Sequence, residues 1–254
     1  MEFENRVAVV TGAGMGMGKA TAVAFAREGA SVAVADINSE AGAETVAQIQ
    51  AEGGRAIFID ADVAKAADAQ HIAIEAVNAF GGIDILVNNA GIQHYGSVVE
   101  TTEAEWDRVL GVNLKSIFLC SKYCIPEIQK RGGGAVINVA SVQGMASQER
   151  VAPYSATKGG AISLTRNMAI DFASSNIRVN CVCPGSIDTP LLRAAAELTD
   201  DPQGTVREWG DANVLKRIGR PEEVAQVILF LAGDRSSFIT GAAYVVDGGL
   251  TIQL

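Results

Sequence analysis

The sequence predicts an α/β fold, a single doubly wound domain in which a parallel seven-stranded sheet carries helices on both faces. Three observations indicate this class. Short apolar runs alternate with longer stretches of helical period, which is the pattern of βαβ units. The strand-like runs are mostly continuous rather than alternating, as expected for strands covered on both faces. The chain has 254 residues and no repeat or linker, which suits one domain.

Seven strands are expected in chain order. Each is a short apolar run that contains Val or Ile, and β-branched residues favour strands. The expected strands are residues 6–10, 31–35, 56–59, 83–87, 135–139, 178–183 and 243–246.

Six helices are expected between these strands, because the intervening stretches are too long for turns and repeat their apolar residues with a helical period. They are residues 18–28, 40–52, 67–80, 103–131, 154–174 and 222–232.

Residues 189–219 do not follow this alternation of strands and helices. The segment is richer in polar residues, contains Pro190 and Pro202, and has no expected strand. A stretch of this length outside the sheet is often a lid or a binding loop. We therefore expect residues 1–254 to form one domain with a substrate lid at about 189–219.

The composition excludes several classes of function. The net charge is −9 and no basic run occurs, which argues against a nucleic-acid partner. No run reaches the ~18 apolar residues of a membrane helix, and the N-terminal MEFENRVAVV does not resemble a signal peptide. We expect the four cysteines to be reduced and buried, in a cytoplasmic protein without a metal site, because no C-x-x-C occurs and only two histidines are present.

A glycine-rich turn follows the first expected strand. Its residues, Thr11 to Gly18, fit the spacing T-G-x-x-x-G-x-G, with Gly12, Gly16 and Gly18 at the glycine positions. A strand, such a turn and a helix start together form an anion site, because backbone N–H groups and the helix dipole face a pyrophosphate. The alternative is a turn with a packing role only.

Asp36 closes the second strand, 20 residues after Gly16. A carboxylate at this place binds the 2′-hydroxyl of the NAD ribose and repels the 2′-phosphate of NADP. Met15 and Ile37 carry no charge that could offset this repulsion. The sequence therefore predicts NAD as the cofactor, with a turn or cap role for Asp36 as the alternative.

Further motifs follow in a fixed order. They are Asn88-Asn89-Ala90-Gly91 after the fourth strand, Asn113, Ser141 after the fifth strand, Tyr154-Ser-Ala-Thr-Lys158, and Pro184-Gly185 followed by Thr189. Together with the glycine turn, this set resembles the classical short-chain dehydrogenase/reductase family over nearly the whole chain. The resemblance implies a Rossmann-type fold and an NAD-dependent oxidoreductase that acts on CH–OH groups.

The residues Tyr154, Lys158 and Ser141 also make chemical sense without the family. Tyr154 and Lys158 are four apart at a helix start, so they share one face. An ammonium there, together with a positively charged nicotinamide, would stabilise tyrosinate and lower the pKa of Tyr154. Ser141 ends a strand at the carboxyl edge of the sheet, where open α/β folds bind ligands.

The resemblance assigns a role to each of these residues. Tyr154 is the general acid/base, Ser141 orients the substrate oxygen, and Lys158 binds the nicotinamide ribose and tunes Tyr154. Asn113 bends its helix and helps to anchor a water in the proton path. The resemblance also implies cofactor contacts at Gly12, Met15, Gly16, Met17, Gly18, Asp36, Ile37, Asp62, Val63, Asn89, Ala90, Gly91, Tyr154, Lys158, Pro184, Gly185, Ile187 and Thr189.

The substrate is left open by the sequence. Expected pocket residues are Gln93, His94, Ser141, Gln143, Tyr154, Ser186 and Trp209, which suit a small polar molecule. The run Ile92-Gln93-His94 resembles the 3-hydroxybutyrate dehydrogenase branch. That branch also expects a Lys, a His and a Trp where this chain has Val151, Gln143 and Ser186. Sugar, diol, cyclic alcohol and hydroxyacid substrates all remain open.

Two hypotheses of different classes follow, an NAD-dependent alcohol oxidoreductase and a catalytically silent NAD-binding sensor or scaffold. The complete set of Asn113, Ser141, Tyr154 and Lys158 favours the enzyme. The resemblance also implies a homotetramer. The segments 116–128 and 161–172 carry more apolar positions than one sheet face needs, and the segment 241–254 is apolar, so these segments are expected at subunit contacts.

Overall fold

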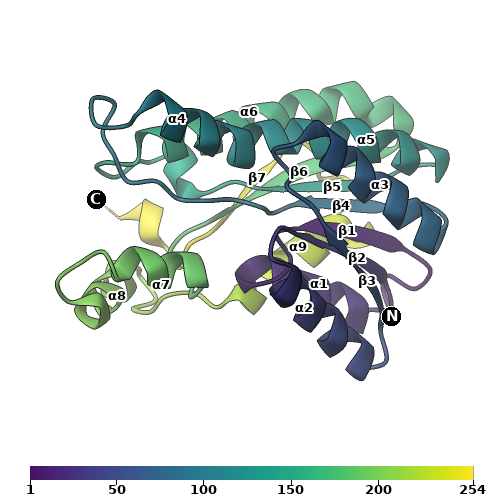
Figure 1. Cartoon of the computed structure of the whole chain (residues 1–254), viewed down its shortest axis with the longest axis horizontal. Helices are drawn as coiled ribbons and strands as arrows, with labels where there is room; N and C mark the ends of the chain where they lie inside the picture. Colours follow the sequence, from purple (N-terminus) through teal and green to yellow (C-terminus); the bar gives the residue numbers. More distant parts are fainter. Residues whose placement is uncertain (254) are drawn as a thin grey trace.

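The structure is a computed structural model, and it describes residues 1–253. It confirms the expected fold class: one sheet of seven parallel strands with helices on both faces (Figure 1). The strands are β1 (Val7–Thr11), β2 (Ser31–Asp36), β3 (Arg55–Asp60), β4 (Ile85–Asn88), β5 (Gly134–Val139), β6 (Ile177–Pro184) and β7 (Ala243–Val246).

The helices form two layers on the sheet, as Figure 1 shows. One face carries α1 (Gly16–Arg27), α2 (Ser39–Ala51) and α9 (Pro221–Ala232). The other carries α3 (Ala66–Phe80), α4 (Glu103–Leu110), α5 (Ser116–Lys130) and α6 (Ala152–Phe172). The expected boundaries of these strands and helices differ from those of the structure by no more than two residues, apart from the division of the segment 103–131 described below.

The strand order is β3-β2-β1-β4-β5-β6-β7, so the winding reverses between β1 and β4. Parallel strands leave a crevice outside their carboxyl ends at such a reversal, and ligands bind there. Both loops that leave this point are motifs from the sequence: the glycine-rich turn after β1 and the Asn-Asn-Ala-Gly run after β4. The topology therefore brings them side by side.

The segment expected as one helix over residues 103–131 is divided. A π-helical turn, Gly111–Lys115, separates α4 from α5. Asn113 lies in this turn, and its side chain is bonded to the backbone of Ile92, a residue from another loop. The bend therefore depends on a contact between distant parts of the chain.

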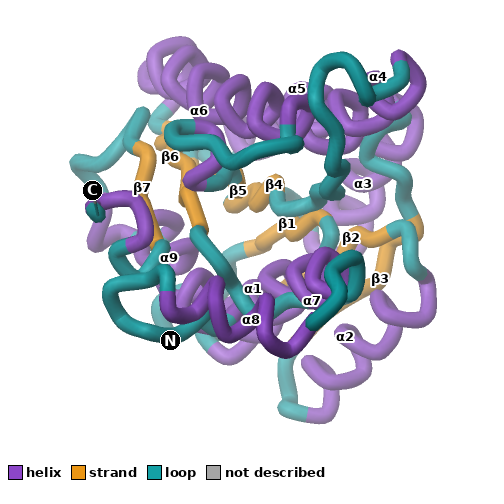
Figure 2. Tube along the Cα trace, turned by 90° about the vertical axis from the view of Figure 1, so that its left-hand side faces the viewer, coloured by secondary structure: helices purple, strands orange, loops and turns teal. Residues whose placement is uncertain are grey.

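The lid segment contains two helices that the sequence analysis did not predict, α7 (Pro190–Ala196) and α8 (Pro202–Asp211). Each begins at a capping side chain followed by proline: Thr189 accepts from the N–H of Leu192, and Asp201 accepts from the N–H of Gly204. Figure 2 views the molecule from the side where the strands end, and α7 and α8 lie on this side.

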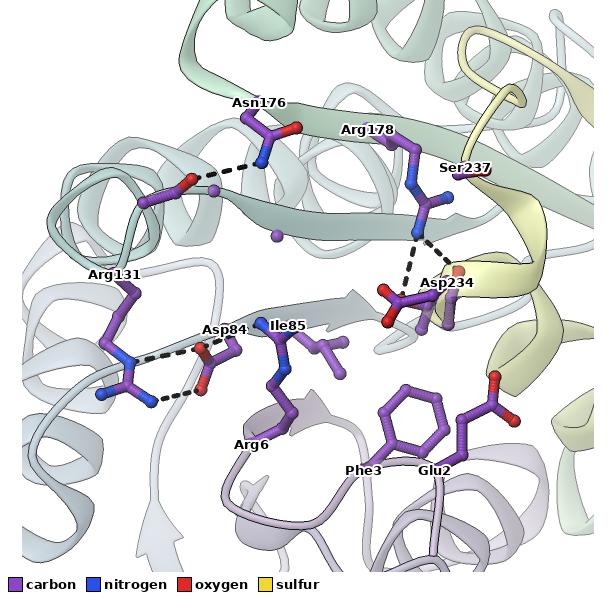
Figure 3. Close-up of a pocket in the computed structure, with 15 residues that line it drawn as sticks. Glu2, Phe3, Arg6, Asp84, Ile85, Arg131, Asn176, Arg178, Asp234 and Ser237 are labelled. Carbon is purple, nitrogen blue, oxygen red and sulfur yellow. Dashed lines mark hydrogen bonds and ion pairs between the residues drawn. The ribbon is translucent and has the colours of Figure 1, made fainter.

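The opposite edge of the sheet has a polar hollow of about 340 Å³ (Figure 3). Asp84, which is 2% exposed, accepts from the N–H of Val7 and pairs with the guanidinium groups of Arg131 and Arg6. Arg178 donates to carbonyl oxygens at the C-terminal end of α9. The charged side chains in this hollow are paired with other groups of the protein. They therefore hold the amino ends of the strands together and are not free to bind a ligand.

Candidate active site

The glycine-rich turn is shaped for close contact with a ligand. Gly12 and Gly16 have φ values of +61° and +55°, in the left-handed region that favours glycine. A Cβ at Gly12 would lie 2.8 Å from the Cα of Ala90. Helix α1 starts without a capping side chain at Met15 and without an acid in its first turn. Its first N–H groups therefore remain for an anion, as the pyrophosphate of a dinucleotide requires.

Asn89 ties the end of β4 to this turn. Its side-chain amide donates to the carbonyl oxygens of Thr11 and Gly12, each at 3.0 Å. The hydroxyl of Thr11 accepts from the N–H groups of Asn89 and Ala90. These bonds hold the two loops at the reversal point in one arrangement. Asn89 therefore fixes the backbone of the glycine-rich turn, which is the candidate phosphate site.

Asp36 lies at the end of β2 beside the same turn. Its carboxylate accepts from the N–H of Gly14 at 2.7 Å and of Asn38 at 2.9 Å, and the residue is 8% exposed. The two bonds fix the orientation of the carboxylate and leave further lone pairs on its oxygens. The side chains of Met15 and Ile37 are exposed and bring no positive charge. Asp62 and Val63 follow β3 as expected.

The four predicted catalytic residues gather at the ends of β4 and β5. Ser141 follows β5, Tyr154 and Lys158 lie on α6, and Asn113 lies in the π-helical turn. The Nζ atom of Lys158 is 5.5 Å from the centroid of the Tyr154 ring. A Cβ at Gly91 would lie 3.6 Å from both the Lys158 Nζ and the Asn113 Oδ1, so these two side chains border one point beside Gly91.

Buried polar contacts set the position of α6 on the sheet. Asn88 of β4 donates to the side chain of Asn138 of β5 at 2.8 Å, and Asn138 donates to Thr165 of α6 at 2.9 Å. Lys158 donates from Nζ to the carbonyl oxygen of Val139 at 2.8 Å. The helix that carries Tyr154 is therefore fixed directly to β5, and through Asn138 to β4.

Asn113 is held by two bonds to one residue. Its Oδ1 accepts from the N–H of Ile92 at 2.8 Å, and its Nδ2 donates to the carbonyl oxygen of Ile92 at 2.9 Å. Asn113 is 1% exposed. The paired bonds fix the loop after β4, on which Gln93 and His94 lie, against the bent helix.

Ser141 is oriented by the turn that follows it. Its Oγ accepts from the N–H of Gln143 at 3.1 Å. This contact occupies an acceptor site of the hydroxyl and leaves the proton free for another oxygen. The pKa of Tyr154 responds to the same hydroxyl, because a hydrogen bond to Ser141 lowers it.

Burial dominates the pKa values of Tyr154 and Lys158. It raises the pKa of Tyr154 from 10.0 to about 12, and the Ser141 hydrogen bond opposes that rise only in part. Burial also lowers the pKa of Lys158 from 10.5 to about 8. The lowered pKa of Tyr154 that the sequence predicts depends on the Lys158 ammonium together with a bound nicotinamide. In the protein alone the pKa shifts in the opposite direction, because removing the phenolate from water outweighs the Ser141 hydrogen bond.

A cavity of about 440 Å³ opens at this edge, between the predicted catalytic residues Ser141 and Tyr154 and the segment 189–219. Of the predicted substrate residues, Gln93, Ser141, Gln143, Tyr154, Ser186 and Trp209 line it. His94 does not; its imidazole lies 3.8 Å from the carboxylate of Glu105. Of the predicted cofactor residues, Met17, Tyr154, Pro184, Gly185, Ile187 and Thr189 also line it.

Several residues of the cavity wall were missed by the sequence analysis. They are Tyr95, Val142, Leu191, Leu192, Ala195, Leu250, Thr251 and Gln253, among others. The cap and proline at Thr189-Pro190 could have predicted α7 and with it the leucines. The C-terminal residues carry no comparable signal. No charged side chain occurs among the described residues that line this cavity.

Comparison with known proteins gives consistent matches. A family model described as enoyl-(acyl carrier protein) reductase matches residues 12–251. An uncharacterised oxidoreductase of Thermotoga maritima is 44% identical over 251 residues, which cover 99% of either chain. Cyclohexanol dehydrogenase of Acinetobacter sp. (strain SE19) is 42% identical, over 98% of this chain and 96% of its own.

Among solved structures, the ligand-free aldohexose dehydrogenase of Thermoplasma acidophilum superposes with a TM-score of 0.92 at 36% identity, over 99% of this chain and 96% of that one. The fold is that of a family of oxidoreductases that bind a nicotinamide cofactor. The chain belongs to the short-chain dehydrogenase/reductase family. None of the helices among residues 1–253 is long and apolar enough to span a membrane.

Proposed function

We propose that the protein is an NAD-dependent alcohol dehydrogenase or ketone reductase. It moves a hydride between the carbinol carbon of a small secondary alcohol and nicotinamide, with Tyr154 as general acid/base. The observation that carries this proposal is that Ser141 and Tyr154 line a cavity together with Met17 of the glycine-rich turn. The Nζ atom of Lys158 lies 5.5 Å from the centroid of the Tyr154 ring, behind the cavity wall.

In this proposal the cofactor lies along the carboxyl edge of the sheet. The first turn of α1 holds its pyrophosphate, and Asp36 accepts from the adenosine ribose. The remaining predicted cofactor residues lie at the same carboxyl ends of the strands. They range from Asp62 and Val63 after β3 to the segment 184–189 after β6. The bound nicotinamide supplies the hydride acceptor or donor.

The chain's own residues handle the proton. Ser141 directs its hydroxyl proton to the substrate oxygen, because its acceptor site is occupied by the N–H of Gln143. Tyr154 removes the hydroxyl proton during oxidation and returns it during reduction. A raised pKa keeps Tyr154 protonated at neutral pH, so the free protein is poised for reduction. Lys158 supplies positive charge and a donor beside the ring.

The cavity favours a neutral substrate. No side chain among its described lining residues carries a charge that could pair with a carboxylate, which disfavours a hydroxyacid. The relatives named for cyclohexanol and for aldohexose point to uncharged alcohols as well. A sugar, a diol or a cyclic alcohol is therefore the substrate class we propose.

The test is NADH formation against a panel of sugars, diols, cyclic alcohols and hydroxyacids. The variant Tyr154→Phe should lose at least about 100-fold in kcat/KM, since general acid/base groups contribute about that much or more. Tyr123→Phe, away from the site, is the matched control. Wild-type turnover by Tyr154→Phe, or faster turnover with NADP than with NAD at equal concentration, would overturn the respective assignment.

We also propose a homotetramer in the cytoplasm. An open apolar groove on α5 and α6 includes Leu114, Phe118 and Leu164, and Phe118 is 52% exposed. Such a face suits a second copy of the chain, and the apolar C-terminal segment offers a second face. Light scattering should give four chains for wild type and fewer for Phe118→Glu. Four free, buried cysteines suit a reducing compartment.

A further inference from the structure

Among the described residues that line the cavity, Gln143 alone has a buried side-chain polar atom without a hydrogen-bond partner. Its side chain lines the cavity, two residues after Ser141. The Oε1 atom is shielded from solvent and has no hydrogen-bond partner among the described residues. Leaving a buried polar atom unpaired destabilises a fold, so such an atom calls for an explanation.

The backbone around Gln143 is held firmly. Its N–H donates to the Ser141 Oγ at 3.1 Å, and the N–H of Gly144 donates to the Ser141 carbonyl oxygen at 3.0 Å. Gly144 packs so closely on α6 that a Cβ there would lie 2.7 Å from the carbonyl carbon of Lys158. The backbone of Gln143 is therefore fixed relative to Ser141 and to α6, which carries Tyr154 and Lys158.

The buried, unpaired amide oxygen distinguishes Gln143 from the other polar residues of the cavity. The amide of Gln93 donates to the carbonyl oxygen of His94 at 3.5 Å. The hydroxyl of Thr251 donates to Asp247 at 2.7 Å. The Gln143 amide has both a donor and an acceptor to offer, and only a rotation of its terminal torsion is needed to turn either one toward the cavity.

We infer that Gln143 determines specificity for a substrate that carries a second hydroxyl beside the reacting carbinol, as a vicinal diol or a polyol does. This inference rests on the proposed function and narrows its substrate class. A hydroxyl can donate to Oε1 or accept from Nε2, whereas a carboxylate has no proton for Oε1. Ser141 and Tyr154 hold the reacting oxygen, and Gln143, two residues from Ser141, holds the neighbouring one.

The test compares matched alcohols that differ by one hydroxyl. Wild type should turn over trans-1,2-cyclohexanediol with a higher kcat/KM than cyclohexanol, and 2,3-butanediol with a higher value than 2-butanol. Gln143→Met keeps the length of the side chain and removes the amide. We expect the diol-to-monol ratio of kcat/KM to fall by about 10- to 100-fold, the effect of losing a well-made hydrogen bond to substrate.

Two readouts separate recognition from a structural role. Gln203→Met changes an exposed amide on α8 and should leave the ratio as it is in wild type. The midpoint of urea unfolding of Gln143→Met, without substrate, should equal or exceed that of wild type, because the amide makes no bond among the described residues. A lower midpoint together with an unchanged ratio would show a structural residue and overturn the inference.

The outcomes also separate this inference from the proposed function. If Tyr154→Phe abolishes turnover but wild type does not prefer the diols, or Gln143→Met leaves the ratio unchanged, the inference fails and the proposed function stands. If wild type turns over no alcohol of the wider panel with NAD, the proposed function fails and the inference fails with it.

Discussion

Replacing Lys158 with methionine should stabilise the cofactor-free protein. The Lys158 side chain is 3% exposed, and burial lowers its pKa from 10.5 to about 8. At about 1.36 kcal/mol for each pH unit, the charged form costs about 3 kcal/mol of folding free energy at pH 7. Methionine removes that cost and also removes the bond to the Val139 carbonyl oxygen, a loss of about 1 kcal/mol. The net gain at pH 7 is about 2 kcal/mol.

The gain should depend on pH in a defined direction. Between pH 8 and 10.5 the unfolded chain still holds the Lys158 proton and the folded protein has released it, so wild-type stability rises with pH across this range. Below pH 8 the penalty is complete. The advantage of Lys158→Met should therefore shrink by about 2 kcal/mol between pH 7 and pH 10.

The assay is urea unfolding of both proteins without cofactor, at equal protein concentration, at pH 7 and at pH 10. All other titrating groups are shared, so the difference between the two proteins isolates Lys158. Lys130→Met replaces an exposed lysine and should change stability by less than about 1 kcal/mol at either pH. A variant less stable than wild type at pH 7, or an advantage that does not change with pH, would refute the reasoning.

Three further predictions concern other parts of the molecule. Asp36→Asn should lower the preference for NAD over NADP, as the ratio of kcat/KM, by about 10-fold or more, because the carboxylate no longer repels a 2′-phosphate; an unchanged ratio would contradict this. Asp84→Ala should cost about 3 kcal/mol in urea unfolding, since it leaves buried donors unpaired, with kcat retained because Asp84 lies at the opposite edge. Gly144→Ala should reduce kcat/KM at least about 10-fold by forcing the turn after β5 away from α6, whereas Gly159→Ala, whose nearest contact is 3.4 Å, should be tolerated. Equal losses from the two glycine variants would argue against this packing.

The fold was predictable because its strands are buried on both faces and their sequences show it. The run of Val and Ala in β1 and β2, for example, has no reading as a surface strand. The division of the long helix was not predictable in the same way. It depends on Asn113 meeting Ile92, 21 residues away, and helical periodicity contains no information on that contact.

The candidate site was predictable in its residues but not in its energetics. The motifs place Tyr154 and Lys158 on one helix face, and the spacing alone suggests an ammonium that lowers the pKa of the tyrosine. The balance of burial and charge depends on how much protein surrounds both groups, which local spacing does not contain. The lid helices are a different case, because Thr189 and Asp201 each stand before a proline and that signal was in the sequence.

Polar groups are paired within the protein at the amino ends of the strands, whereas several remain unpaired or buried at a cost at the carboxyl ends. This difference points to function. At the amino edge, Asp84 is matched by Arg131, Arg6 and a backbone N–H, so the charges there stabilise the fold. At the carboxyl edge, the first turn of α1 has no capping side chain, Lys158 is buried at a cost in free energy, and the Gln143 amide has no partner among the described residues. Folded proteins leave such groups unsatisfied where something else completes them. The pyrophosphate, the nicotinamide ribose and a second substrate hydroxyl are three partners of the right chemistry, one for each group.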